Sequence, residues 1–356
     1  MIAPLSIAFF GSSLVSSYWN GAATYYRGMI RALHQRGHSV TFYEPDAYER
    51  QAYRDMDDPD WATVVVYPAT EEGVVRSLEA ARGADIVVKA SGVGVFDEFL
   101  EQEVLSLKRE GTQIIFWDVD APATLARLRE NPDDPFRHQI PRYDLVLTYG
   151  GGNPIVQSYG SFGARRCIPI YNGLDPETHF PVKPDSRFQV DLAFLGNRLP
   201  VRERRVENFF LDVAAGLPHR RFLLAGSGWD YKQSADNIAF LDHLDTCDHN
   251  AFNCSAKAIL NISCNSMTDN GFSPATRVFE AAGAGACIIT DKWEGIDYFF
   301  EPEKEIYVAA SGDEVAGILD QLTPEISCLV GKRAMTRARA EHTYAHRARQ
   351  FEGIFG

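Results

Sequence analysis

The segment 271–286 holds the side chains whose types and spacing best suit binding chemistry. Ser273 followed by Pro274 is typical of a helix start, because a hydroxyl caps free backbone N–H groups and proline fits the first turn. Free N–H groups and the helix dipole attract anions, and Gly271, which has no side chain, would let a diphosphate approach closely. The pattern therefore predicts a site for a phosphorylated ligand.

Two charged residues follow in this predicted helix. Arg277 lies one turn after the start and offers a permanent charge with a planar fork of donors for phosphate oxygens. Glu280 lies three residues further on the same side, where its carboxylate would accept hydrogen bonds from the vicinal hydroxyls of a ribose. The alternative is an ordinary capped helix with an Arg277–Glu280 pair on its surface, and spacing alone leaves both interpretations open.

A second pair of reactive side chains, Asp118 and Asp120, directly follows the apolar run 113–117. Carboxylates at a strand end are placed to take a proton from an attacking hydroxyl group. We prefer Asp120 as the base, because Asp118 can point into the opposite face of the sheet. The alternative is that an aspartate here caps the helix that follows.

The elements that must position these groups follow from an alternation of apolar runs with helical patterns along the whole chain. This alternation predicts parallel sheets covered by helices on both faces, and 356 residues suit two domains. We therefore predict an α/β fold with two Rossmann-like, doubly wound parallel-sheet domains that face a central cleft. The predicted strands are 5–10, 39–43, 85–89, 113–117, 145–148 and 167–170, and then 190–195, 222–225, 238–241, 259–263 and 286–290.

A proline-rich stretch without helical or strand period separates the two series of strands. It predicts a first domain over 1–170, a linker over 171–188, and a second domain over 189–356. We expect the second domain to hold the phosphate site, and the last helix to pack back on the first domain.

Composition excludes several other classes of protein. The net charge of -13 argues against a nucleic-acid partner. No apolar run approaches the roughly 20 residues that cross a bilayer, and the first ten residues do not resemble a cleaved signal, so we expect a cytoplasmic protein. The six cysteines form no C-x-x-C pair and are expected as reduced thiols. His243, Cys247, His249 and Cys254 gather in one stretch without a standard zinc spacing, which favours an ordinary loop and helix and predicts no metal site.

The segment 271–286, with Cys287-Ile-Ile-Thr-Asp291 and the stretch 294–300 after it, resembles the C-terminal signature of GT-B glycosyltransferases. The resemblance extends over most of the chain, through 194–198 and 222–229, and is strongest to family 4-like and spore-maturation-type (CgeB-like) enzymes. It implies a hexosyltransferase-type enzyme that moves a sugar from a nucleoside diphosphate sugar to a hydroxyl acceptor without a metal. An epimerase or hydrolase on the same fold, or a non-catalytic sugar- or nucleotide-binding structural protein, remains the alternative.

The resemblance also implies roles for individual residues. Glu280 would contact the ribose, the helix start would hold the diphosphate, and a basic residue of the loop 196–202 would offset the charge of the leaving group. Arg204 and Arg205 are instead interpreted as part of a solvated helix face, with Glu203 and Glu207 as partners. The implied donor site is Arg198, Arg202, Gly226, Gly271, Phe272, Ser273, Pro274, Ala275, Thr276, Arg277 and Glu280.

Phe272 departs from the family pattern, because retaining family 4 enzymes carry a second glutamate at this position. Retention or inversion at the anomeric carbon therefore stays open. In the N-terminal half, the loop from Gly11 and Ser12 to Asn20 and Gly21 is too long for a dinucleotide fingerprint. The resemblance implies that this loop lies near the acceptor and the donor phosphates. The base, the sugar and the acceptor cannot be read from the sequence.

Overall fold

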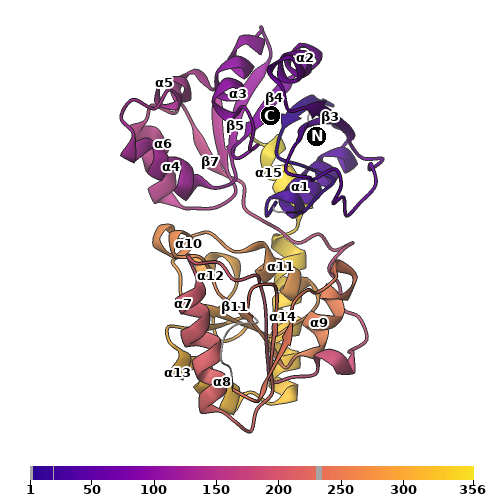
Figure 1. Cartoon of the computed structure of the whole chain (residues 1–356). Coiled ribbons are helices and arrows are strands. Elements are labelled where there is room, and N and C mark those ends of the chain that lie inside the picture. Colours follow the sequence, from indigo (N-terminus) through magenta and orange to yellow (C-terminus); the bar gives the residue numbers. More distant parts are fainter. Residues whose placement is uncertain (1–2, 19, 230–234) are drawn as a thin grey trace. The chain divides into compact units, whose positions relative to one another are not determined.

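The computed structural model describes residues 3–18, 20–229 and 235–356 and divides the chain into two compact units (Figure 1). The first unit comprises Met1–Asn172 and Tyr344–Gly356, and the second comprises Gly173–Thr343. Residues 173–188, which we expected to be a linker, thus belong to the second unit. Within the described residues, no helix combines the length and the apolar character needed to span a membrane.

The first unit is built on a seven-stranded parallel sheet in the order β3-β2-β1-β4-β5-β6-β7. The chain leaves β1 toward β2 and β3 and then returns to β4 on the other side, so the strand order reverses between β1 and β4. Loops after these two strands meet at the carboxyl edge of the sheet, where ligands bind in open α/β sheets. The strands are β1 Ser6–Phe10, β2 Ser39–Asp46, β3 Thr63–Pro68, β4 Ile86–Ala90, β5 Gln113–Asp118, β6 Leu145–Thr148 and β7 Cys167–Pro169.

Two hydrophobic clusters, one on each face of this sheet, explain why its strands are continuous apolar runs. Phe10 of β1 belongs to one cluster and Phe9 to the other. The last helix joins the second cluster through Ala348 and Phe351, which are fully buried. The helices of this unit are α1 Ala23–Gln35, α2 Glu71–Ala81, α3 Asp97–Glu103, α4 Ala121–Glu130, α5 Phe136–Gln139, α6 Asn153–Ser161 and α15 Tyr344–Glu352.

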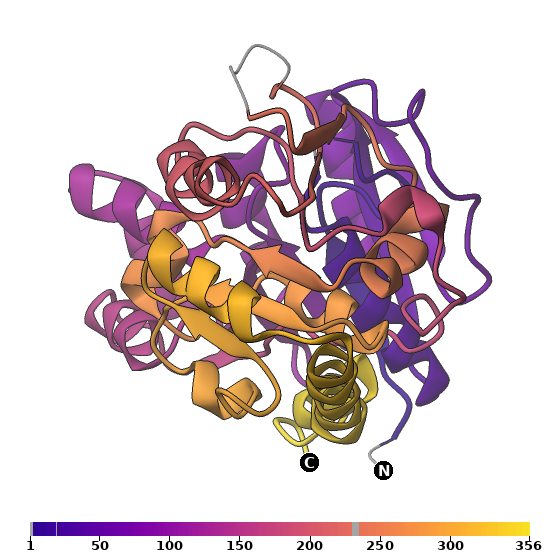
Figure 2. The ribbon, with the colours of Figure 1, turned by 90° about the horizontal axis from the view of Figure 1, so that it is seen from below.

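The second unit repeats this architecture with a six-stranded parallel sheet in the order β10-β9-β8-β11-β12-β13, covered by helices on both faces (Figures 1 and 2). Here the strand order reverses between β8 and β11. The strands are β8 Leu192–Leu195, β9 Phe222–Ala225, β10 Ile238–Leu241, β11 Ala258–Asn261, β12 Ile288–Asp291 and β13 Tyr307–Ala309. The helices are α7 Glu203–Val206, α8 Asp212–Gly216, α9 His249–Ser255, α10 Asn265–Asn270, α11 Thr276–Gly283, α12 Ile296–Phe299, α13 Gly312–Gln321 and α14 Pro324–Glu341, with a π-helical segment Glu207–Leu211 between α7 and α8.

The prediction of two doubly wound parallel sheets is confirmed, and each predicted strand is present within a few residues of its expected ends. Two strands were not predicted, β3 and β13. Both pair with one neighbour only and lie at sheet edges.

Candidate functional site

The predicted donor residues lie in the segments that follow β8, β9 and β11 in the second unit, most of them on loops and Thr276, Arg277 and Glu280 in α11. Because these strands are parallel neighbours, their following loops meet at one edge of the sheet. Because the strand order reverses between β8 and β11, the chain leaves these two neighbouring strands in opposite directions.

Two glycines allow the loops after β8 and β9 to come together. Gly226 has a φ of 134°, and a Cβ added there would lie 2.4 Å from the carbonyl oxygen of Gly196. Trp229 donates from its ring nitrogen to the same oxygen at 2.8 Å. A Cβ on Gly196 would lie 2.5 Å from a guanidinium nitrogen of Arg202. The missing side chains therefore make room for Arg202 at the strand end.

The stretch before α11 is a loop and not the first helical turn that we predicted. Helix α11 spans Thr276–Gly283, and its N-cap residue is Ala275. Gly271 and Phe272 both have positive φ, 63° and 44°, and the Ser273 hydroxyl donates to the Gly271 carbonyl at 2.8 Å. The prediction that Ser273 caps the helix is therefore wrong, because the left-handed turn delays the helix by two residues.

Phe272 is held firmly in this unfavourable backbone conformation. Its N–H donates to the carbonyl oxygen of Glu294 at 2.6 Å, and its ring lies so close to Gly295 that an added Cβ would be 2.4 Å away. A left-handed aromatic residue persists only where its surroundings enforce it, and such residues cluster at functional sites. Phe272 thus shapes the loop in front of α11, where the resembling enzymes carry a glutamate.

Arg202 and Arg277 bring two guanidinium groups together at the carboxyl edge. Burial lowers the pKa of Arg277 to about 10; Glu280 opposes this lowering and Arg202 adds to it. Burial likewise lowers the pKa of Arg202, whose terminal nitrogen donates to the Asn197 carbonyl at 2.8 Å. The buried Nε atoms of both arginines have no hydrogen-bond partner among the described residues. Two poorly solvated cations with unused donors form a site that an anion would stabilise.

Glu280 lies on the next turn of α11 with 17% of its side chain exposed, and its Oε1 is 3.9 Å from Nε2 of His179. His249, at the start of α9, is close by, since the charges of Glu280, Arg277 and His179 all act on its pKa. A carboxylate with a partly open face can still accept hydrogen bonds from a ligand. Sequence reasoning missed His179 altogether and considered His249 only as a zinc ligand.

Two other arginines of the basic stretch 198–205, Arg198 and Arg205, make ion pairs. Arg198 pairs with Glu203 at 2.7 Å. Arg205, expected on a solvated helix face, instead pairs at 2.5 Å with the fully buried Asp291, while Arg204 is exposed. The expectation for Arg205 is therefore wrong, because Asp291 ends a buried strand and needs a compensating cation. The same strand-end pattern that drew attention to Asp118 was present at Asp291.

In the first unit, Asp118 lies at the end of β5 and is fully buried. Its Oδ1 accepts hydrogen bonds from Ser91 Oγ at 2.7 Å and Thr124 Oγ1 at 3.1 Å, and its Oδ2 accepts one from the Tyr159 hydroxyl. Burial raises its pKa despite these bonds. This carboxylate ties together the ends of β4 and β5 and two helices, and it has no surface to offer a substrate.

Asp120 differs from Asp118 in being exposed, as the residue directly before α4. Partial desolvation raises its pKa, and the nearby charge of Asp118 raises it further. Its N–H donates to Asp118 Oδ1 at 3.0 Å, which fixes the backbone between the two aspartates. A carboxylate that is accessible, rigidly placed and more basic than usual suits proton abstraction.

The loop after β1 is fixed by hydrogen bonds within itself and by others to Glu44 and Asp55. Ser12 Oγ donates to Asn20 Oδ1 at 2.9 Å, and Asn20 Nδ2 donates to the Ser13 carbonyl at 2.8 Å. Ser12 and Asn20 are therefore buried and shape the loop. A Cβ on Gly11 would lie 2.4 Å from the Phe42 ring, whereas Gly21 has open space around it. Of the residues predicted for this loop, Gly21 is exposed.

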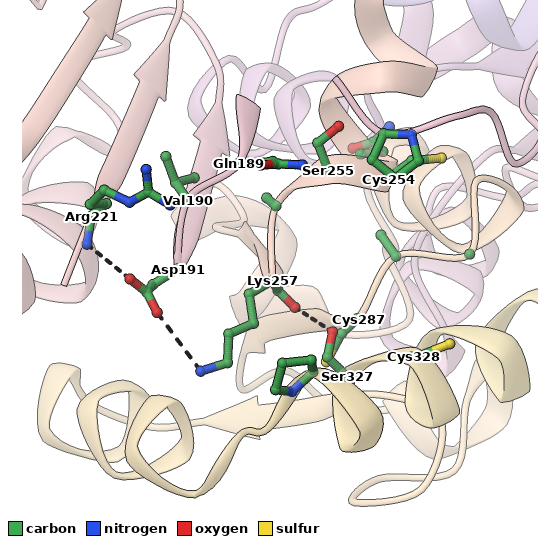
Figure 3. Close-up of a pocket in the computed structure, with 16 residues that line it drawn as sticks. Gln189, Val190, Asp191, Arg221, Cys254, Ser255, Lys257, Cys287, Ser327 and Cys328 are labelled. Carbon is green, nitrogen blue, oxygen red and sulfur yellow. Dashed lines mark hydrogen bonds and ion pairs between the residues drawn. The ribbon is translucent and has the colours of Figure 1, made fainter. Parts of the chain in front are cut away.

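The second unit also holds a cavity of about 550 Å³ (Figure 3), and none of the predicted donor-site residues lines it. Its lining includes Asp191, Lys257 and Cys287, which directly precede β8, β11 and β12. The cavity therefore opens at the amino ends of the strands, opposite the edge that carries Arg202. Asp191 accepts from the Arg221 N–H at 2.9 Å and pairs with Lys257 at 3.8 Å.

The described residues contain no group of three His, Cys, Asp or Glu side chains arranged to hold a metal ion. All six cysteines, each within the described part of the chain, are free thiols. The structure thus brings Arg202, Arg277 and Glu280 together in the second unit and leaves Asp120 open in the first.

Comparison with known proteins identifies the architecture. Solved structures with this arrangement include a sucrose-phosphate synthase from Thermosynechococcus elongatus, with a TM-score of 0.68 and 13% identity over 99% of this chain and 98% of that chain. Anabaena Alr3699/HepE in complex with UDP and glucose has a TM-score of 0.68 and 13% identity over 99% of each chain. An alpha-glucosyltransferase in complex with UDP and a 13-mer DNA has a TM-score of 0.71 and 11% identity over all of both chains.

The fold is GT-B. Identities of 11–13% establish the fold and nothing finer. Residues 202–353, less than half of the chain, match the family model described as glycosyl transferase-like. This GT-B span begins at Arg202 and includes Arg277 and Glu280. A search of the curated proteins finds no match to the sequence.

Proposed function

We propose that this protein transfers a sugar from a nucleoside diphosphate sugar to a hydroxyl acceptor. The observation that carries the proposal is the pair of partly buried guanidinium groups, Arg202 and Arg277, with Nε donors that no described residue uses. Their like charges oppose each other, and a diphosphate bound between them would relieve that repulsion. Glu280, one turn along α11, is proposed to accept hydrogen bonds from the ribose hydroxyls.

The same arginines support transfer without a metal ion. When the bond from the anomeric carbon to the diphosphate oxygen breaks, negative charge develops on the leaving phosphate. Arg202 and Arg277 would offset this charge directly, which is the role that a divalent cation has in other transferases. The proposal therefore predicts that a chelator leaves the rate unchanged.

We assign the proton-accepting role to Asp120 of the first unit. In an inverting transfer, the acceptor oxygen bonds to the anomeric carbon, the diphosphate departs with its bonding electrons, and Asp120 takes the hydroxyl proton. Its raised pKa makes it a stronger base than an ordinary aspartate. Asp118 is assigned the positioning of this segment, since its carboxylate is buried and hydrogen-bonded. Phe272 stands where retaining family 4 enzymes carry a second glutamate, and the lack of that carboxylate favours inversion.

Nucleotide binding tests the proposal first. Thermal-shift and calorimetric titrations with UDP, GDP, dTDP and CDP would identify the base, and the Arg277→Met variant serves as the site control. The solved relatives in complex with UDP make UDP the first choice. Nucleotide release from the matching sugar donor is then measured with acceptor mixtures, with and without EDTA.

The outcomes separate the candidate functions. Tight nucleotide binding that Arg277→Met weakens, with nucleotide release that depends on an acceptor, supports transfer. Release that needs no acceptor would instead indicate a hydrolase, and binding of none of the four nucleotides would refute the proposal.

A further inference from the structure

His179 lies on a chain segment that packs directly against the helix of the candidate site. A Cβ added to Gly283 of α11 would lie 2.3 Å from Leu174 Cδ1 and 2.9 Å from the His179 carbonyl oxygen. Because Gly283 lacks a side chain, the segment 174–179 approaches the face of α11 that also carries Glu280, three residues earlier. The close packing brings His179 beside that carboxylate.

A second element, α9, holds this segment in place. Asn250 Nδ2 donates to the Thr178 carbonyl at 2.9 Å, and the Phe180 N–H donates to Asn250 Oδ1 at 3.3 Å. One amide side chain thus binds the backbone on both sides of His179. Only 9% of His179 is exposed, so its imidazole has little freedom to reorient.

The two ring nitrogens of His179 face different partners. Nδ1 is 2.9 Å from Thr178 Oγ1, and Nε2 is 3.9 Å from Glu280 Oε1. The Thr178 hydroxyl also lies 3.3 Å from the Asp175 carbonyl, so its one proton has two possible acceptors, of which Nδ1 is the nearer. Because the carboxylate that faces Nε2 can only accept, the ring proton is favoured on Nε2, and the hydroxyl then donates to Nδ1. Nε2–H then points toward the Glu280 carboxylate. The 3.9 Å between Nε2 and Oε1 is longer than a hydrogen bond, so the contact is electrostatic. A small movement of either side chain would turn it into a hydrogen bond.

Two other groups that can carry charge, His249 and Arg277, lie near Glu280. Burial lowers the pKa of His249, and Arg277 and His179 lower it further, although Glu280 opposes them. His249 therefore stays neutral near pH 7. Arg277 lies one turn before Glu280 and is the residue that we assign to the diphosphate. His179 also approaches Glu280 from outside α11, with its Nε2 at 3.9 Å from Glu280 Oε1.

We propose that His179 is a positioning residue that orients the Glu280 carboxylate toward the ribose hydroxyls of the donor nucleotide. This inference rests on the proposed function. By restraining Oε1 through Nε2–H, His179 keeps the carboxylate from rotating toward Arg277 and leaves it ready to accept from the 2′- and 3′-hydroxyls. Its effect on binding therefore exists only when the ligand has those hydroxyls and the protein has Glu280.

The test is a binding cycle with UDP and 2′,3′-dideoxy-UDP, measured by titration calorimetry on the full chain. We expect His179→Ala to weaken UDP binding by about tenfold and dideoxy-UDP binding by less than about twofold. In a Glu280→Ala background the same substitution should have no further effect on UDP. A general disturbance of the fold would weaken both ligands in both backgrounds.

Matched variants sharpen the result. His179→Gln keeps an N–H near the position of Nε2 and should restore most of the UDP affinity. Thr178→Val changes an exposed side chain and removes the partner of Nδ1, so it should weaken UDP but not dideoxy-UDP. His219→Ala, an exposed histidine just before the amino end of β9, is the control and should change neither affinity.

Equal losses for the two ligands, no loss with His179→Ala, or additive losses in the double variant would each overturn the role of His179. If His179→Ala does not fold, the Thr178→Val titrations decide the question alone. These failures differ from failure of the proposed function, in which the wild-type protein would bind neither UDP nor GDP, dTDP or CDP.

Discussion

Replacing Arg277 with methionine should make the protein without ligand more stable while weakening its nucleotide binding. The surroundings of Arg277 lower its pKa from 12.5 to about 10. Arginine is charged in the folded and unfolded states at pH 7, so the folded state bears the full penalty at all pH values below 10. Since one pKa unit corresponds to about 1.36 kcal/mol, the penalty is roughly 3 kcal/mol.

Methionine keeps much of the aliphatic length of arginine and carries no charge. Some packing and the attraction to Glu280 are lost, so we expect a net gain of about 1–2 kcal/mol. For a unit of this size that gain raises the melting temperature by roughly 2–8 °C. The lost charge-assisted hydrogen bonds to phosphate contribute about 1.5–3 kcal/mol, which predicts UDP binding weaker by about 10- to 150-fold.

Differential scanning calorimetry with and without UDP measures both effects, with titration calorimetry for affinity. Arg204→Met is the matched control, because Arg204 is exposed and its removal should change neither quantity. A variant at 277 that melts below the wild type without ligand would refute the strained-cation argument. Unchanged UDP affinity would remove Arg277 from the site.

Three further predictions follow from individual carboxylates. Glu280→Ala should weaken UDP binding by about tenfold with little change in melting temperature, since it opens no core cavity; a large drop in melting temperature would show a structural role instead. Asp120→Asn should reduce turnover by about 10²-fold or more with donor affinity nearly unchanged, and wild-type turnover should rise with pH through the raised pKa of Asp120; equal turnover in the variant would move the base elsewhere. Burial alone would raise the pKa of Asp191, but the Arg221 N–H, Arg220 and Lys257 lower it overall, so its contribution to stability is present above about pH 4 and is lost as the pH falls through the lowered value. Asp191→Asn should therefore unfold more easily at pH 7, by roughly 1–3 kcal/mol, and this difference should disappear in urea titrations at low pH.

The central strands of both sheets could be predicted because each is an apolar run buried on two faces. The runs at 145–148 and 222–225 match β6 and β9 residue for residue. β3 and β13 were not predicted, but position at a sheet edge is not the reason, since the edge strands β7 and β10 were predicted. Three of the six residues of β3 are exposed and one is buried, so its run of three valines belongs to a strand that is not buried on two faces.

The candidate site was predicted in composition but not in local geometry. Ser273 and Pro274 look like a helix start, yet the positive φ of Phe272 turns the chain so that the helix begins at Thr276. The residue type does not predict this left-handed conformation, because phenylalanine seldom adopts a positive φ. The Glu294 carbonyl accepts the Phe272 N–H, and Gly295, which has no side chain, makes room for the Phe272 ring. The conformation therefore depends on both of these residues.

The pairs that give the site its electrostatics join residues far apart in the sequence, and this is why spacing rules could not find them. Arg202 follows β8 and Arg277 follows β11, and these strands are neighbours because the strand order reverses between them. Arg205, which also follows β8, reaches Asp291 at the end of β12, one strand beyond β11. Arg205 is thereby neutralised by the buried Asp291. Arg202 and Arg277 instead lie close to each other, and Glu280 offsets only part of their combined positive charge. Topology therefore decides which cations of the basic stretch 198–205 serve the fold and which remain for an anionic ligand.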